Sequence, residues 1–283
     1  MIARKEWPEE FRLWNQKYHA PYGPNWWQRR RVKRLLWAKR MELPAWMMRL
    51  IGPFGFQGNS PSRAFEYPWC FFCTPLSPGM RAVDIGAGAS GFQFVLAERG
   101  LEVTSIDPLI DTEGSHWVFS PSAHEKLQKA FGVTLQFVPK YLHEAELQSD
   151  SYDRVFSISV MEHASAEMIA RTSKEIGRIL KPGGLFVATV DLFLGCYPFT
   201  DKISNKWGSN VSIRDLVDAS GMELVQGNRS ELYGYPEFDV ETIRRLSSNS
   251  TDFMIVNKES LLTQCLVLEK PKNGVAAHAA SGH

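Results

Sequence analysis

A carboxylate followed at once by a glycine-rich stretch is the part of this chain best suited to chemistry. Asp84 lies in a short apolar run, and Gly86, Gly88 and Gly91 come directly after it. Glycines let the backbone adopt conformations that side chains forbid and pass close to a bound nucleotide. The stretch therefore predicts a nucleotide-binding turn between a buried strand and a helix.

The charge of Asp84 distinguishes between classes of nucleotide ligand. The glycine spacing also matches the dinucleotide pattern, but a carboxylate at the strand tip would repel a pyrophosphate. It would attract an ammonium or a sulfonium, since unit charges about 4 Å apart near a protein surface interact by roughly 4 kcal/mol. S-adenosylmethionine (SAM) has both cations and no phosphate. The residues therefore favour SAM over NAD or FAD.

A second acid follows at the spacing that ribose binding requires. The segment 101–107 reads as a strand ending in Asp107, which is 21 positions after Gly86. In nucleotide-binding α/β units, an acid about 20 residues beyond the first glycine accepts hydrogen bonds from ribose. Alone, Asp107 is equally well interpreted as a solvated loop acid. Beside Asp84 and the glycines, the ribose interpretation is favoured.

These residues must be positioned by alternating strands and helices. The segment 152–158 reads as a strand that ends in a polar tip, and 164–180 as a helix. The helix is predicted to stop at Lys181-Pro182-Gly183-Gly184, because lysine, proline and glycine together end helices. Further elements are expected at 92–99 (helix), 185–190 (strand), 212–220 (helix), 221–225 (strand) and 263–270 (strand).

Four motifs resemble those of class I SAM-dependent methyltransferases in order and spacing, most closely the branch that methylates small molecules. They are VDIGAGASG, the acid of SIDP, YDRVFSISVMEHA and ILKPGGLFVATV. The resemblance covers about residues 65–270. It implies an α/β, Rossmann-like fold with a seven-stranded, mostly parallel sheet, helices on both faces and an antiparallel last strand. It also implies an enzyme that uses SAM.

The resemblance further implies which residues hold the donor. Arg63 could pair with the methionine carboxylate, and Tyr67 could pack or hydrogen-bond beside it or simply pack on the sheet. The adenine loop departs from the usual Gly-Asp-Ala pattern, so the adenine contact near Leu142 stays open. The implied cofactor-binding residues are Asp84, Gly86, Ala87, Gly88, Asp107, Pro108, Leu142, Ser159, Arg63 and Tyr67.

Transfer to a hydroxyl needs a group that removes a proton. His163 follows the strand that starts at Tyr152, on the edge where open α/β sheets bind ligands, and its ordinary pKa near 6.5 suits this task. Glu162 could orient it or contact the acceptor. The alternative is that both residues only cap the next helix or shape the pocket. No metal is expected, because the Cys70/Cys73 pair lacks two further ligands.

The chain's charge is concentrated in its first residues. Residues 1–50 contain twelve Lys or Arg, four Glu and six of the nine tryptophans, whereas the whole chain has a formal charge of +1. Such basic, Trp-rich helices are typical of anchors on anionic lipid, but also of polyanion binding and of a cap with solvated charges. We expect a basic helical extension or cap with a linker at 1–62, the catalytic domain at 63–270 and a disordered tail at 271–283.

The favoured function is methyl transfer from SAM to a hydroxyl of a small molecule or glycan, which could be membrane-linked or anionic. Two alternatives stay open: an RNA or other nucleic-acid methyltransferase, and a non-catalytic SAM-binding module. No apolar run reaches the roughly 20 residues that cross a bilayer, and no signal core is evident. We therefore expect a cytoplasmic protein, with peripheral association at the inner membrane face as a further hypothesis. The oligomeric state stays open.

Overall fold

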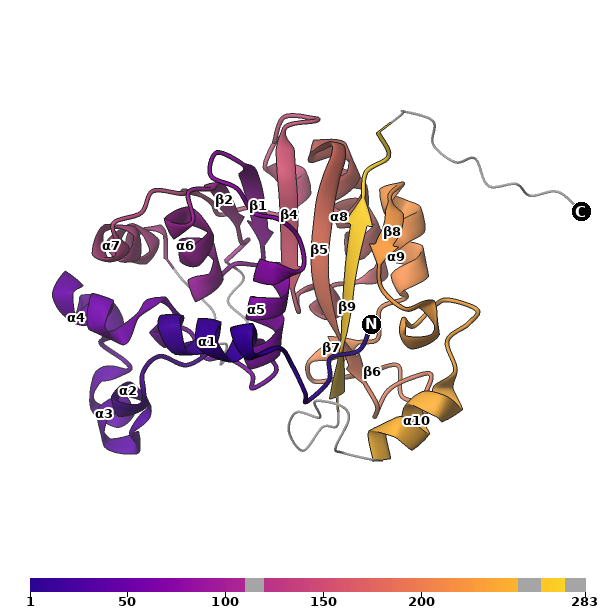
Figure 1. Ribbon diagram of the computed structural model, residues 1–283, viewed down its shortest axis with the longest axis horizontal. Coiled ribbons are helices and arrows are strands. Elements are labelled where there is room, and N and C mark those ends of the chain that lie inside the picture. Colours follow the sequence, from indigo (N-terminus) through magenta and orange to yellow (C-terminus); the bar gives the residue numbers. More distant parts are fainter. Residues whose placement is uncertain (110–119, 249–260, 273–283) are drawn as a thin grey trace, which may run out of the picture. The chain divides into compact units, whose positions relative to one another are not determined.

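A computed structural model describes residues 1–109, 120–248 and 261–272. Its main sheet has seven strands in the order β3-β2-β1-β4-β5-β9-β8, which confirms the expected Rossmann-like α/β fold (Figure 1). The strand order reverses direction after β1, as it does in open α/β sheets that bind ligands at this point. The strands are β1 Arg81–Ile85, β2 Glu102–Ile106, β3 Gln136–Val138, β4 Tyr152–Ile158, β5 Leu180–Phe193, β8 Glu223–Gln226 and β9 Leu261–Glu269.

The chain divides into two compact units, one of residues 6–145 and one of residues 1–5 with 146–283. In the first unit, β1 pairs in parallel with β2, from Arg81 opposite Glu102 to Ile85 opposite Ile106. Strand β2 pairs in parallel with β3. Residues 82–85 are all buried, as the continuous apolar sequence of a central parallel strand requires. The helices of this part are α5 Arg63–Phe72, α6 Gly91–Glu98, α7 Pro121–Phe131 and the short η3 Leu142–Glu144.

The basic N-terminal region packs on the same unit through aromatic side chains. Helix α1 contacts α5, α4 contacts α7, and η2 contacts α6. The Phe54 ring lies 4.9 Å from the Tyr67 ring and 5.6 Å from the Trp14 ring, between ring centroids. At Gly91 a Cβ would come within 2.7 Å of Phe54, so only glycine fits there. The elements are α1 Glu9–Tyr18, α2 Asn25–Gln28, α3 Arg30–Leu36, η1 Arg40–Glu42, α4 Ala45–Ile51 and η2 Pro53–Gly55.

In the second unit β5 is the central strand. It pairs in parallel with β4 and antiparallel with β9, which pairs antiparallel with β8. The antiparallel last strand confirms the expectation for 263–270. The other elements are η4 Met161–His163, α8 Ala166–Ile179, β6 Ser204–Asn205, β7 Gly208–Ser209, α9 Ile213–Ser220, η5 Arg229–Glu231 and α10 Val240–Ser248.

One predicted boundary is wrong. The sequence predicts a helix up to residue 180, a break and a strand from 185, but β5 already begins at Leu180. Leu180 pairs with Tyr152, whereas the next pair joins Leu185 to Arg154. The intervening residues, including Gly183 with φ +78°, therefore form a bulge inside the strand rather than a loop before it.

The first residues of the chain belong to the second unit and pair with β9. Ile2 forms an antiparallel bridge with Gln264, and the Ala3 amide donates to the Thr263 carbonyl at 2.8 Å. Ile2 is buried, and its amide donates to Glu231 at 2.7 Å. Residues 1–5 thus lie in a different unit from the rest of the expected extension. Of the predicted tail, residues 273–283 lie outside the described residues.

Candidate functional site

The tip of β1 holds a buried carboxylate next to the glycine turn. Asp84 is only 3% exposed, and its Oδ2 has no hydrogen-bond partner within the described parts of the chain. Burial, and then the charge of Asp107, raise the pKa of Asp84 to about 8. Gly86 and Gly88 follow with φ +65° and +48°, a left-handed conformation that favours glycine. A buried, unpartnered carboxylate is stabilised by a cation beside it or by protonation.

Asp107 connects the two loops at the ends of β1 and β2. Its Oδ2 accepts the Gly88 amide and its Oδ1 accepts the Leu109 amide, both at 2.9 Å. Burial raises the pKa of Asp107, and these two backbone donors oppose the shift. Each carboxylate oxygen can accept more than one hydrogen bond, so Asp107 retains capacity for a ligand hydroxyl. The structure therefore brings Asp84, Gly88 and Asp107 together.

Two glutamines that the sequence analysis missed hold the glycine turn. Gln57, from the N-terminal region, accepts the Ala89 amide at 2.7 Å. Gln93, on the first turn of α6, donates from Nε2 to the carbonyls of Gly88 at 3.1 Å and Ser90 at 3.0 Å. Both glutamines are buried. No motif marks them, because their partners are defined only by the folded chain.

A buried histidine extends this support toward β3. His124 Nε2 lies 2.6 Å from Gln93 Oε1, and His124 Nδ1 lies 3.1 Å from Gln128 Nε2. Burial lowers the pKa of His124 to about 4, so the ring is neutral near pH 7. Because Gln93 Nε2 donates to the turn, Gln93 Oε1 must accept, which assigns the His124 proton to Nε2. The Gln128 oxygen then accepts the Leu135 amide at 2.9 Å.

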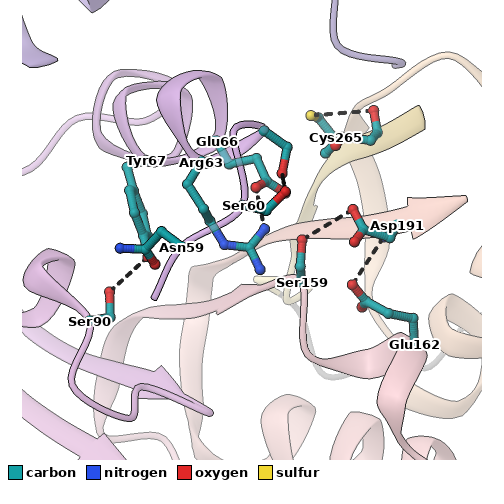
Figure 2. A network of polar contacts seen from close by, with 12 residues as sticks. Asn59, Ser60, Arg63, Glu66, Tyr67, Ser90, Ser159, Glu162, Asp191 and Cys265 are labelled. Carbon is teal, nitrogen blue, oxygen red and sulfur yellow. Dashed lines mark hydrogen bonds and ion pairs between the residues drawn. The ribbon is translucent and has the colours of Figure 1, made fainter. Parts of the chain in front are cut away.

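Helix α5 brings two predicted residues into a buried polar network (Figure 2). The Tyr67 hydroxyl donates to Asn59 Oδ1 at 3.0 Å and accepts from Ser90 Oγ at 3.3 Å. Burial raises its pKa to about 12. Arg63 forms an ion pair with Glu66 one turn further along α5, and both side chains are buried. Tyr67 therefore supports the glycine turn directly, and the Arg63 guanidinium has a carboxylate partner within its own helix.

In the second unit, a polar network occupies the carboxyl ends of β4 and β5 (Figure 2). Ser159 is buried with φ +46°, and its Oγ donates to Asp191 Oδ1 at 3.4 Å. The Asp191 amide donates to Glu162 Oε1 at 3.3 Å, and Glu162 is fully buried. The network fixes the short turn η4, which ends at His163.

His163 is exposed, and a hairpin fixes the orientation of its ring. The ring Nδ1 hydrogen-bonds to the backbone carbonyl of Trp207 in the β6–β7 hairpin. A carbonyl can only accept, so the neutral ring has its proton on Nδ1 and its lone pair on Nε2. The hairpin packs closely against η4, because a Cβ at Gly208 would lie 1.8 Å from the Glu162 carbonyl oxygen. Asn205 Oδ1 accepts the Trp207 amide at 2.7 Å and holds the turn.

The remaining predicted residues have simpler surroundings. Leu142 is buried in η3, Ala87 is buried in the glycine turn, and Pro108 is half-buried after β2. Within residues 1–109, 120–248 and 261–272, no three His, Cys, Asp or Glu side chains are grouped to hold a metal. Cys70 is buried and Cys73 is half-buried. No described helix is both long and apolar enough to cross a membrane.

Comparison with known proteins identifies the family of the central part. Residues 83–188 match a family described as "Methyltransferase domain". A Mycobacterium sp. (strain JLS) protein named "Uncharacterized methyltransferase" is 29% identical over 171 residues, which are 56% of this chain and 62% of that protein. A ubiquinone biosynthesis O-methyltransferase of Rhizobium leguminosarum bv. trifolii (strain WSM2304) is 31% identical over 115 residues, or 40% of this chain and 41% of that one.

A solved structure with the same fold is phosphoethanolamine N-methyltransferase 2 of Haemonchus contortus in complex with SAM. The TM-score is 0.52 at 17% identity, over 87% of this chain and 59% of that one. At this identity the likeness establishes the fold alone. The matched region contains Asp84, the glycine turn, Asp107, Ser159 and His163.

Proposed function

Because residues 83–188 match a methyltransferase domain and the motifs of the chain resemble those of class I SAM-dependent methyltransferases, we propose that it transfers a methyl group from SAM to a hydroxyl of a small-molecule or glycan acceptor. When bound, SAM supplies a methyl group already activated by its sulfonium. The observation that carries the proposal is Asp84, a buried carboxylate oxygen without a described partner at the tip of β1. A cationic ligand compensates this charge, whereas a phosphate would oppose it.

The residues around Asp84 have the properties that SAM requires. The left-handed glycines Gly86 and Gly88 leave room for a ligand close to the backbone. Asp107 offers carboxylate oxygens to ribose hydroxyls, and the buried Leu142 offers an apolar contact to adenine. Ala87, Pro108, Ser159, Arg63 and Tyr67 complete the proposed set, with Tyr67 acting through its hydrogen bond to the turn residue Ser90.

For the acceptor, we assign the general base to His163. Its Nδ1 proton is held by the Trp207 carbonyl, so the Nε2 lone pair is available to accept the proton of a hydroxyl. The ring is exposed, and the buried Glu162 fixes the short turn η4 that contains His163. Glu162 is therefore proposed as a positioning residue. A ring with this tautomer and exposure supports base catalysis more strongly than a role as a helix cap.

The test combines donor binding with product detection. Calorimetry measures SAM binding to the wild type, Asp84→Asn and His163→Ala, and mass spectrometry follows the gain of one methyl group in extracts of the source organism. We expect Asp84→Asn to lose SAM binding, and His163→Ala to keep it while turnover falls by about 10²–10⁴-fold. SAM binding without any methylated product would favour the non-catalytic module. Near-normal turnover of His163→Ala would remove the assigned base.

The matched segment covers only 62% of the Mycobacterium relative. The partners of this chain are therefore proposed from its own residues. We assign to residues 1–50 the binding of an anionic membrane surface. Trp26, Trp46 and Leu50 expose 39%, 59% and 58% of their area in this strongly basic region, as interfacial anchors do. Sedimentation with phosphatidylcholine vesicles, with and without phosphatidylglycerol, tests the idea. Binding that ignores both anionic lipid and salt would exclude it.

A further inference from the structure

A hollow of about 710 Å³ in the N-terminal region is lined by cations. Its lining residues are Gln28, Arg30, Lys33, Arg34, Trp37 and Gly58, with no carboxylate among them. Burial lowers the pKa of the half-buried Lys33. Three like charges around one hollow repel each other, and an anion between them would remove this repulsion.

The walls of the hollow also supply hydrogen-bond donors at suitable positions. Arg30 and Arg34 are four residues apart on α3, so they lie on one face of the helix. A single arginine guanidinium binds phosphate oxygens through two parallel hydrogen bonds. Gln28 adds an independent sign of a missing acceptor: its Nε2 is buried and has no hydrogen-bond partner in the described chain. An oxygen of a bound anion would satisfy it.

The Trp37 ring, which lines the hollow, is in contact with two cationic side chains. The Lys33 amino group lies 5.1 Å and the Arg40 guanidinium 4.4 Å from the centre of the Trp37 ring. Arg40 Nε also donates to the Phe56 carbonyl at 2.8 Å. The short helix η1, which follows the basic helix α3, is therefore attached to the segment 56–59 that leads to α5.

The segment 56–59 contacts both the hollow and the proposed donor site. Gly58 lines the hollow. Its neighbour Gln57 accepts the Ala89 amide in the glycine turn at 2.7 Å, and its other neighbour Asn59 accepts the Tyr67 hydroxyl at 3.0 Å. A change in the position of this short segment would therefore alter two hydrogen bonds that support the glycine turn.

We propose that the hollow binds a phosphate-bearing anion and that its occupancy changes the affinity for SAM through the segment 56–59. A phospholipid headgroup and a free phosphate compound offer the same chemistry. The second half of the inference rests on the function proposed above, whereas the first half does not. Coupling between two sites is reciprocal, so SAM must change the affinity of the hollow by the same factor.

The first experiment tests the hollow without SAM. Calorimetry with inorganic pyrophosphate compares the wild type with Arg30→Ala/Arg34→Ala and with the control Arg171→Ala/Lys174→Ala, which removes two exposed cations of α8. We expect the hollow variant to bind at least about tenfold more weakly, because each arginine contributes charge-assisted hydrogen bonds. Equal losses in both variants would reduce the binding to general charge attraction and overturn the site.

A second measurement uses the wild type alone, so it does not depend on how the variants fold. Amine-specific acetylation is followed at Lys33 and at the exposed Lys129 by mass spectrometry. Pyrophosphate should protect Lys33 and leave Lys129 unchanged. Lack of selective protection would contradict the site.

Two further experiments identify the source of the phosphate and test the coupling between the hollow and the SAM site. Phosphatidylglycerol vesicles that compete with pyrophosphate indicate a lipid headgroup, and vesicles that do not compete indicate a free phosphate compound. Saturating pyrophosphate should change the SAM dissociation constant by about fivefold, a typical coupling. Gln57→Ala should bind pyrophosphate normally and reduce this factor toward one. An unchanged SAM dissociation constant in the wild type refutes the coupling, whereas a wild type that does not bind SAM refutes the proposed function.

Discussion

Replacing Asp84 by Asn keeps the shape of the side chain and removes its charge. Burial raises the pKa of Asp84 from 3.8 to about 8, which corresponds to a preference of roughly 6 kcal/mol for the neutral form in the folded protein. The unfolded chain ionises first, so the donor-free wild type loses stability as the pH rises from about 4 to about 8 and stays level above. The variant has no charge to bury. Its unfolding free energy should exceed that of the wild type by several kcal/mol at pH 8 and equal it near pH 4.

The affinity for SAM should fall in Asp84→Asn, although the stability of this variant rises. A carboxylate and a cation about 4 Å apart attract by roughly 4 kcal/mol at an effective dielectric constant near 20. Asp84→Asn is therefore expected to bind SAM at least about a hundredfold more weakly. Because a cationic ligand binds the ionised form of Asp84, the affinity of the wild type should rise with pH toward about 8. The variant should lack this part of the pH dependence.

Urea unfolding followed by circular dichroism, at pH 5 and pH 8, measures the stability difference. Calorimetry over the same range measures SAM affinity. Glu102→Gln serves as the control, since this exposed acid begins β2 and its removal should change neither quantity. The reasoning would be refuted if Asp84→Asn bound SAM within about threefold of the wild type. Identical changes in stability with pH for both proteins would refute the account of the buried charge.

Two further substitutions test the packing around the site, and a third tests the packing of α8 on α9. Gly208→Ala places a Cβ 1.8 Å from the Glu162 carbonyl oxygen, so the hairpin must move away. We expect turnover to fall at least about tenfold while the affinity for SAM stays unchanged. Unaltered turnover would contradict the role of the hairpin. His124→Leu leaves Gln93 Oε1 without its donor, so urea unfolding should show a loss of about 1–3 kcal/mol; a variant as stable as the wild type would refute this. Gly177→Ala brings a Cβ 2.2 Å from a backbone oxygen at the end of α9. The substitution should lower the free energy of unfolding by about 1–3 kcal/mol. An unchanged melting temperature would show that α8 and α9 tolerate separation.

The sequence predicted the strands and the position of the glycine turn well because their signals are local. Asp84 and the glycines are consecutive, and Asp107 follows at a spacing set by one helix and one strand. The continuous apolar segments of β1 and β4 correspond to buried central strands. The bulge in β5 was missed because proline and glycine in a bulge look like those of a loop until the partner strand is known.

The sequence could not predict the support of the glycine turn. Gln57 reaches Ala89 across 32 positions, and His124 reaches Gln93 across 31. Neither pair follows a helical or strand periodicity. The contact between His163 and the Trp207 carbonyl spans 44 positions and uses a backbone atom, which leaves no mark on residue type.

The amino-acid sequence by itself determined the fold class, the resemblance to class I SAM-dependent methyltransferases and the acid-glycine turn, because these depend on hydrophobic periodicity and on neighbouring residues. Only the tertiary structure decided that Asp84 is buried beside Asp107, which histidine nitrogen carries the proton at position 163, and that Arg30, Lys33 and Arg34 line one hollow with Gly58. Burial, tautomer and the grouping of charges depend on distances between segments far apart in the chain. Those distances are set by packing, and no local pattern records them.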